Sequence, residues 1–246
     1  MPARTRSELP RPAGSLLATR LLPGRIAGPH AVDALPVAAQ LVAGGYAVAL
    51  EHRPATGDDG RAEPAALLAR IRDTGPPGDL ELTLDVGRLP GARSVAADAT
   101  AAGLSVALEG PAGPVEALLA ELPRARVVVR AGEPGAEERC RALVGSRVRL
   151  QADRGTAARR AFARCVAVLM AGDGHAAVAT ADPLLIAITG ERAAWNGRPS
   201  DSWEHVMPWG VRTSEQRRLV AAGNAVRVAV PTGAGAVATV LRGGLR

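Results

Sequence analysis

The sequence predicts an α/β fold, a closed (β/α)8 TIM-like barrel in a single domain. Short apolar runs typical of strands alternate with helix-like segments, eight such runs occur, and the connections between them are short. Strands that alternate with helices are parallel and joined by crossovers, so eight units close into a barrel without unpaired edges. A doubly wound open sheet also fits the alternation. It requires a glycine-rich turn after the first strand, however, where this chain has Glu51-His52-Arg53-Pro54.

The individual elements follow from local patterns. Leu80-Glu81-Leu82-Thr83-Leu84-Asp85 alternates strictly between apolar and polar residues, as a strand does, whereas Leu67, Leu68 and Ile71 recur at helical spacing. Thr156 is the expected N-cap of the longest helix. Strands are predicted over residues 46–51, 80–85, 104–109, 125–130, 147–152, 176–181, 203–209 and 225–230. Helices are predicted over residues 31–42, 62–73, 91–102, 114–122, 136–144, 156–171, 183–194, 214–222 and 236–242.

Length and composition set the domain organisation. The chain has 246 residues, 47% of them hydrophobic, which suits one domain with a full core. Residues 1–28 are basic and broken by Pro10, Pro12 and Pro23, so we expect a poorly structured or weakly helical segment there and the barrel over residues 29–246. Neither a signal-peptide core nor a run long enough to span a bilayer is present, and we expect a cytoplasmic protein with no membrane span.

The charged residues exclude several kinds of chemistry. All 30 basic residues are arginines, so mechanisms that need a Schiff-base or phosphate-loop lysine are excluded. The arginines are scattered, and the few aromatic residues are too dispersed to form a base-stacking platform, so we expect no nucleic-acid partner. Cys140 and Cys165 lie inside predicted helices without metal-ligand spacing. Nothing in the sequence indicates a protein partner.

In barrels of this kind the functional site lies at the carboxyl ends of the strands. We expect several polar residues there, and their carboxylates suggest two interpretations. They could hold a divalent metal through oxygen ligands, or they could cap the following helices and meet solvent, which is the more common role. The residues expected at these strand ends are Glu51, His52, Asp85, Glu109, Arg130, Asp153, Asp182, Glu204, His205 and Thr232.

Three blocks in the last third of the chain resemble a known family. They are Ala179-Thr180-Ala181-Asp182, the stretch from Trp203 to Arg212, and Val228-Ala229-Val230-Pro231-Thr232-Gly233 running to Leu241-Arg242. In this order and spacing they are similar to the end of the proline dehydrogenases, FAD-dependent barrel enzymes that oxidise L-proline to 1-pyrroline-5-carboxylate. The resemblance implies that Arg149 and Thr180 contact FAD and that Arg242 binds the carboxylate of the substrate.

Several polar positions of that family are replaced in this chain. Each charge-assisted hydrogen bond to a cofactor or substrate is worth roughly 1.5–3 kcal/mol, so their combined loss predicts a flavin site weakened by several powers of ten. The replacements are Thr83 for a lysine, Ala107 for an aspartate, Arg130 for a glutamine, Ala152 for a lysine, Ala181 for a histidine, Thr232 for a tyrosine and Gly243 for an arginine.

Three hypotheses about function remain open from the sequence. The first is a degenerate barrel without a cofactor that acts as a binding or regulatory module for a small-molecule ligand. The second is an active, divergent proline dehydrogenase with FAD. The third is a metal-dependent enzyme that uses the acidic barrel mouth, although the residues do not single out a metal site.

Overall fold

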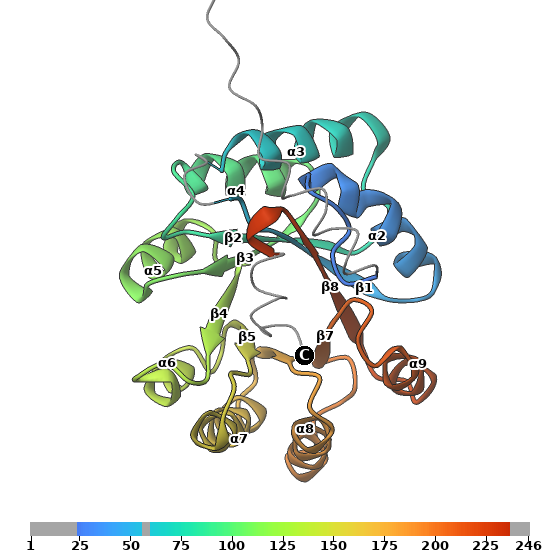
Figure 1. Ribbon diagram of the computed structural model, residues 1–246. Coiled ribbons are helices and arrows are strands. Elements are labelled where there is room, and N and C mark those ends of the chain that lie inside the picture. Colours follow the sequence, from blue (N-terminus) through green and yellow to red (C-terminus); the bar gives the residue numbers. More distant parts are fainter. Residues whose placement is uncertain (1–23, 56–59, 237–246) are drawn as a thin grey trace, which may run out of the picture.

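Eight parallel strands close into one barrel in chain order, as the sequence predicts (Figure 1). This computed structural model describes residues 24–55 and 60–236. The first and last strands close the ring, with Ala49 opposite Ala229 and Leu50 opposite Val230. The strands are β1 (Ala47–His52), β2 (Leu80–Asp85), β3 (Ser105–Glu109), β4 (Arg126–Arg130), β5 (Arg147–Gln151), β6 (His175–Ala179), β7 (Trp203–Pro208) and β8 (Val226–Thr232).

Helices surround the strands on the outside (Figure 1). They are η1 (Ala31–Asp33), α2 (Ala34–Ala43), α3 (Ala62–Thr74), α4 (Ala92–Ala101), α5 (Ala112–Glu121), α6 (Ala136–Ala142), α7 (Thr156–Ala171), α8 (Pro183–Trp195) and α9 (Thr213–Ala221). The helix predicted over residues 236–242 lies outside the described residues except for its first position.

The prediction that Thr156 caps α7 is wrong. Gly155 occupies the N-cap position with φ 98° and ψ 159°, and the cap has no side-chain hydrogen bond. Only glycine adopts that backbone conformation readily, so Gly155 makes the entry into the helix and Thr156 becomes its first residue.

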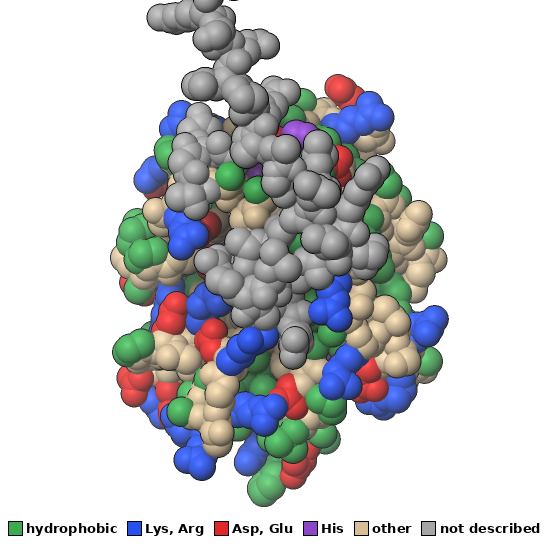
Figure 2. Space-filling model, in the orientation of Figure 1, with side chains coloured by type: hydrophobic (Ala, Val, Ile, Leu, Met, Phe, Trp, Pro, Cys, Tyr) green, Lys and Arg blue, Asp and Glu red, His purple; other side chains and the backbone are tan. Residues whose placement is uncertain are grey.

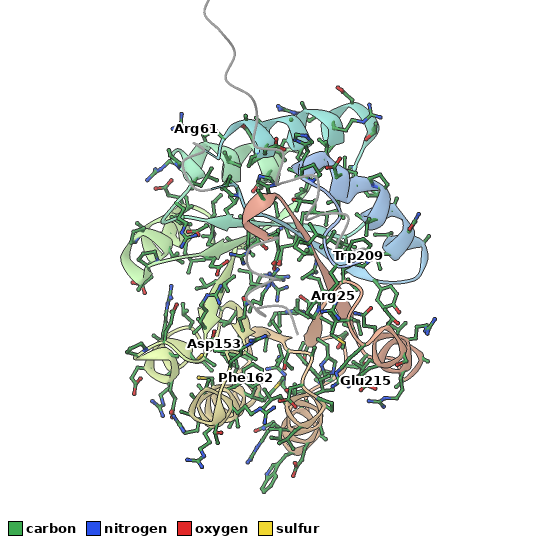
Figure 3. All side chains as sticks on the ribbon, in the orientation of Figure 1. Arg25, Arg61, Asp153, Phe162, Trp209 and Glu215 are labelled. Atoms are coloured by element: carbon green, nitrogen blue, oxygen red, sulfur yellow. The ribbon has the colours of Figure 1, made fainter. Side chains whose placement is uncertain are left out.

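The main hydrophobic core lies between the strands and the helices. Along β2, Leu80, Leu82 and Leu84 belong to this core. Phe162 contributes to it from α7 and points from that helix toward the strands (Figure 3). Successive side chains of a strand point to opposite faces. The polar residues between the leucines, Glu81 and Thr83, therefore face the inside of the barrel.

The described part of the N-terminal segment runs along the barrel end. The Ala27 amide donates to the carbonyl of Pro231 at 3.0 Å, and the Gly233 amide donates to the carbonyl of Gly28 at 2.9 Å. Residues 24–28 are thus hydrogen-bonded to the end of β8. Residues 1–23 lie outside the described part of the chain.

The surface carries mixed charges. On the face that Figure 2 shows, arginine side chains are interspersed with acidic and apolar ones around the rim over α6 to α9. Among the helices of residues 24–55 and 60–236, none is both long and apolar enough to cross a membrane.

Candidate functional site at the barrel mouth

Ion pairs cross the interior of the barrel. Arg149 on β5 donates to Glu81 on β2, and Arg126 on β4 donates from Nε to Glu81 Oε2 at 2.7 Å. Arg126 Nη2 also lies 2.7 Å from Glu204 Oε1 on β7. The strands joined by each of these three pairs are not neighbours in the sheet, so the contacts can form only through the inside of the barrel.

At the end of the barrel where the strands begin, Arg227 on β8 continues this network. Its Nε donates to Glu204 Oε1 at 3.0 Å, and its Nη2 donates to Asp79 Oδ2 at 3.1 Å, just before β2. Arg227 Nη1 adds a bond to the carbonyl of Val48 at 3.2 Å. Charged side chains therefore fill the floor of this barrel.

The buried charges hold one another in the ionised state. Burial by itself raises the pKa of the Glu81 carboxyl, but the nearby Arg126, Arg149 and Arg227 outweigh it and hold that pKa far below its ordinary value. Burial likewise lowers the pKa of Arg149, and Glu81 and Glu51 more than compensate, so it is raised. The interior is thus stable only as a complete set of pairs, since a buried charge without its partner is costly.

Glu51, at the carboxyl half of β1, connects this interior network to the mouth. Arg149 Nη1 donates to Glu51 Oε1 at 2.9 Å. Arg53 Nη2 lies 3.9 Å from Glu51 Oε2 and 3.3 Å from Glu109 Oε2. Arg53 therefore stands between two carboxylates of the mouth.

Arg130 extends the chain of pairs across the mouth to β5. Its Nη2 donates to Glu109, and its Nη1 lies 3.7 Å from Asp153 Oδ1. Burial raises the pKa of Glu109, but Arg53 and Arg130 lower it by more. Six carboxylates and five arginines alternate along this ion-pair chain: Asp153, Arg130, Glu109, Arg53, Glu51, Arg149, Glu81, Arg126, Glu204, Arg227 and Asp79.

A cavity of about 440 Å³, which we call the mouth cavity, opens at the carboxyl ends of β5, β6 and β7. Ala152, Ala181, Met207 and Pro208 contribute apolar wall. The polar and charged residues that line it come from the strand ends and from the start of α7: Glu51, Arg149, Gln151, Asp153, Arg154, Thr156, Arg159, Thr180 and Asp182. Asp153, which follows β5, is labelled in Figure 3.

Arg149 and Thr180, the residues expected to contact FAD, both line the mouth cavity. Arg149 is only 1% exposed, and its terminal nitrogens contact Glu51, Glu81 and Thr83, the last at 3.2 Å. Thr180 accepts a hydrogen bond from the amide of Asp182 at 3.1 Å. Arg242, the residue expected to bind substrate, lies outside the described residues.

The replaced family positions offer little to a flavin. Ala152 and Ala181 present methyl groups to the mouth cavity where the family has a lysine and a histidine. Thr83 is bonded to Arg149, and Thr232 Oγ1 lies 3.0 Å from His52 Nδ1. These residues do not fit FAD, because Arg149 is held by carboxylates and alanines stand where the lysine and the histidine would donate to the flavin.

The carboxylates of the mouth do not form a metal site in the described part of the chain. No group of three or more histidine, cysteine, aspartate or glutamate side chains there is arranged to hold a metal ion. Each of the five candidates is paired with an arginine instead. The pairs are Glu51 with Arg149, Asp85 with Arg88 at 3.6 Å, Glu109 with Arg53 and Arg130, Asp153 with Arg130, and Asp182 with Arg159 at 2.6 Å.

Two residues expected at the mouth lie elsewhere. Glu204 is the second residue of β7 and faces the barrel floor, where Arg126 and Arg227 bind it. His205 points to the outer face, and its ring packs edge-on against Trp203 with centroids 4.7 Å apart. The expectation is wrong because both residues stand at the beginning of β7, whose carboxyl end, as the predicted bounds also indicate, is several residues further on at Pro208.

Sequence reasoning missed Arg53, Arg126 and Arg227. Arg126 opens β4 and Arg227 is the second residue of β8, both strands otherwise rich in valine. In both strands the arginine occupies one of the alternate positions whose side chains point into the barrel, and this alternation was the signal available in the sequence. A charged residue at such a position of a buried strand requires an opposite charge across the barrel.

Neither a protein-family model nor a curated protein sequence matches this chain. Solved structures share its fold. Proline utilization A (PutA) from Bdellovibrio bacteriovorus, inactivated by N-propargylglycine, is similar with a TM-score of 0.72 and 14% identity over 92% of this chain. A structure of PutA with proline bound in remote sites gives a TM-score of 0.59 and 15% identity over 80% of this chain. This chain matches only 32% and 27% of those two chains. The architecture is therefore that of a barrel found within PutA, a proline-dehydrogenase-like fold.

Proposed function

We propose that this protein is a non-catalytic, proline-dehydrogenase-like barrel that binds a small polar molecule in the mouth cavity, without FAD. The observation that carries the proposal is the state of Arg149. Its guanidinium is fully buried, and both of its terminal nitrogens are already bonded within the barrel, Nη1 to Glu51 and Thr83 and Nη2 to Glu81.

The composition of the mouth cavity supports a ligand with both charges. Arg154, Arg159, Asp153 and Asp182 all line it, and its volume of about 440 Å³ is in the range of small-molecule sites. A few convergent polar groups on an otherwise formed pocket fix the orientation of a ligand. A free amino acid matches this pattern in size and charge.

An active, divergent proline dehydrogenase is the second candidate. The retained Thr180 and the placement of Arg149 beside the mouth cavity favour it. Ala152 and Ala181 oppose it, since each removes a charge-assisted hydrogen bond worth roughly 1.5–3 kcal/mol.

The two candidate functions predict different flavin absorbance of the purified protein and different binding of added FAD. We expect the purified protein to show no flavin absorbance and to quench no FAD fluorescence on titration. A free amino acid, with L-proline as the first probe, is expected to raise the melting temperature of the same preparation. Flavin absorbance that bleaches on addition of L-proline would disprove the proposal and establish the second candidate.

A matched pair of variants locates the ligand. Arg159 and its neighbour Arg160 on α7 are both exposed, but only Arg159 lines the mouth cavity. Arg159→Gln is expected to reduce the melting shift caused by the amino acid, and Arg160→Gln, with the same change of charge, is expected to leave it unchanged. Equal effects of the two substitutions would place the ligand elsewhere.

A further inference from the structure

A second cavity, of about 620 Å³, lies beside the mouth cavity at the carboxyl ends of β3 and β4, between the starts of α5 and α6. We call it the α5–α6 cavity. Arg130 lines the α5–α6 cavity and Asp153 lines the mouth cavity, so the ion pair between them belongs to the wall that separates the two. The residues of this second cavity are therefore distinct from those to which the proposed function is assigned.

Four arginines line the α5–α6 cavity, and they differ in their partners. Arg53 and Arg130 share Glu109. Arg88 is 85% exposed and lies 3.6 Å from Asp85. Arg139 on α6 forms no ion pair with any residue of 24–55 and 60–236.

Arg139 is the unusual member of this set. Two of its nitrogens, Nε and Nη2, are buried and have no hydrogen-bond partner in the described part of the chain. Burying a charged donor without an acceptor costs more than burying a neutral one. These two nitrogens are closed to solvent, and no carboxylate of the described part of the chain pairs with the guanidinium to compensate its charge.

The amino end of α5 contributes donors to the same cavity. Ala112, its first residue, lines the cavity, and the N-cap Pro111 has no side chain that could accept from the first amides. The first amides of a helix have no partner within the helix and carry a partial positive charge. This end of α5 and the guanidinium of Arg139 both require an acceptor with negative charge.

We propose that the α5–α6 cavity binds the phosphate group of a small molecule. Its donors come from three separate elements: Arg139 on α6, Arg88 after β2, and the amide end of α5. A planar carboxylate can be satisfied by one guanidinium, whereas a tetrahedral phosphate accepts from several directions at once. Asp85 and Glu133, which also line the cavity, can accept from hydroxyl or amino groups on the rest of the ligand.

Calorimetric titration of the full chain with inorganic phosphate, at constant ionic strength in chloride buffer, tests the proposal. We expect saturable binding that Arg139→Gln weakens about tenfold or more, because one charge-assisted hydrogen bond is lost. Phenyl phosphate identifies the source of the group: tighter binding than inorganic phosphate indicates an ester, and equal or weaker binding indicates the free ion. Absence of saturable binding, or the same affinity in Arg139→Gln as in the natural chain, overturns the proposal.

Two further variants keep the test decisive. Arg160→Gln removes an exposed arginine on α7 and is expected to retain the natural affinity. Arg88→Gln alters a side chain that is 85% exposed, so we expect this variant to fold even if Arg139→Gln does not. The affinity of Arg88→Gln for phosphate is expected to fall several-fold. Phosphate is also expected to shift the amide NMR signals of Ala112 and Gly113. Unchanged signals there, or unchanged affinity in Arg88→Gln, would refute the assignment.

Discussion

The Nη1 nitrogen of Arg149 donates to Oε1 of Glu51 at 2.9 Å, and this contact joins the ion pairs of the barrel floor to those of the mouth. Arg149 is thereby held by its own barrel on both sides, since Glu81 binds its other terminal nitrogen. The residue to which the family resemblance assigns cofactor binding is thus a member of the ion-pair chain.

The first prediction concerns Glu81, which is 1% exposed and is bound by both Arg126 and Arg149. Glu81→Gln leaves buried guanidinium charge uncompensated, so we expect the free energy of unfolding to fall by about 3–5 kcal/mol. Urea denaturation near neutral pH measures this change. Glu138→Gln, at a side chain that is 74% exposed, is the control and is expected to stay within about 0.5 kcal/mol. A loss below about 1 kcal/mol for Glu81→Gln would show that the chain of ion pairs is not a stabilising unit.

The second prediction concerns pH. Burial lowers the pKa of His205 to about 4 from its ordinary 6.5, with Arg218 adding to the decrease and Glu215 opposing it. The unfolded chain therefore binds more protons than the folded one between these values. Stability is fully present above about pH 6.5 and falls as the pH decreases toward 4, by at most about 1.4 kcal/mol for each pH unit.

His205→Leu removes this titration and keeps an apolar side chain against Trp203. We expect its unfolding free energy to change less between about pH 7 and pH 5 than that of the natural chain, because only one of the two histidines whose pKa burial lowers, His175, then remains. Urea denaturation at both pH values measures the difference. Equal slopes for the two proteins would contradict the assignment of the pH dependence to His205.

The third prediction compares two glycines with similar backbone angles. Gly233 has φ 91°, and a Cβ atom there would lie 2.2 Å from the carbonyl oxygen of Arg53, whereas Gly223 has φ 79° and no atom within 4 Å of that position. Both alanine variants carry the cost of a positive φ, but only Gly233→Ala adds a backbone clash. We expect Gly233→Ala to lose about 2 kcal/mol more stability than Gly223→Ala in urea denaturation. A smaller loss for Gly233→Ala would mean that the contact between β8 and the segment after β1 relaxes freely.

The fourth prediction concerns the two cysteines, Cys140 on α6 and Cys165 on α7, which are both buried. A hydrogen bond with Cys165 and burial raise the pKa of the Cys140 thiol, which keeps it protonated. The same hydrogen bond lowers the pKa of Cys165, so the protection of Cys165 depends on its burial. We expect an aromatic disulfide reagent to label neither cysteine in the native protein and both in urea. Rapid labelling of one thiol without denaturant would show that α6 opens from the barrel.

Much of the architecture follows from local sequence patterns. The alternation of leucine with polar residues in β2 marks a strand over residues 80–85, and the structure has the same bounds. The ends of other strands were less predictable. For β6 the apolar run predicts residues 176–181, whereas the strand is His175–Ala179, because hydrogen bonds to neighbouring strands determine where a strand ends.

The sequence predicts that eight strands and their helices form a closed barrel, and the alternation within a strand indicates which of its side chains share a face. It did not determine which inward charges meet. Glu81 lies 45 residues from Arg126 and 68 from Arg149, and only closure of the barrel brings the three together. Periodicity is a local property of the chain, whereas pairing across the barrel depends on the tilt and stagger of all eight strands. For that reason the tertiary structure alone decided that Arg149 serves the scaffold, that Glu204 faces the floor, and that Arg139 is left without a partner in the described part of the chain.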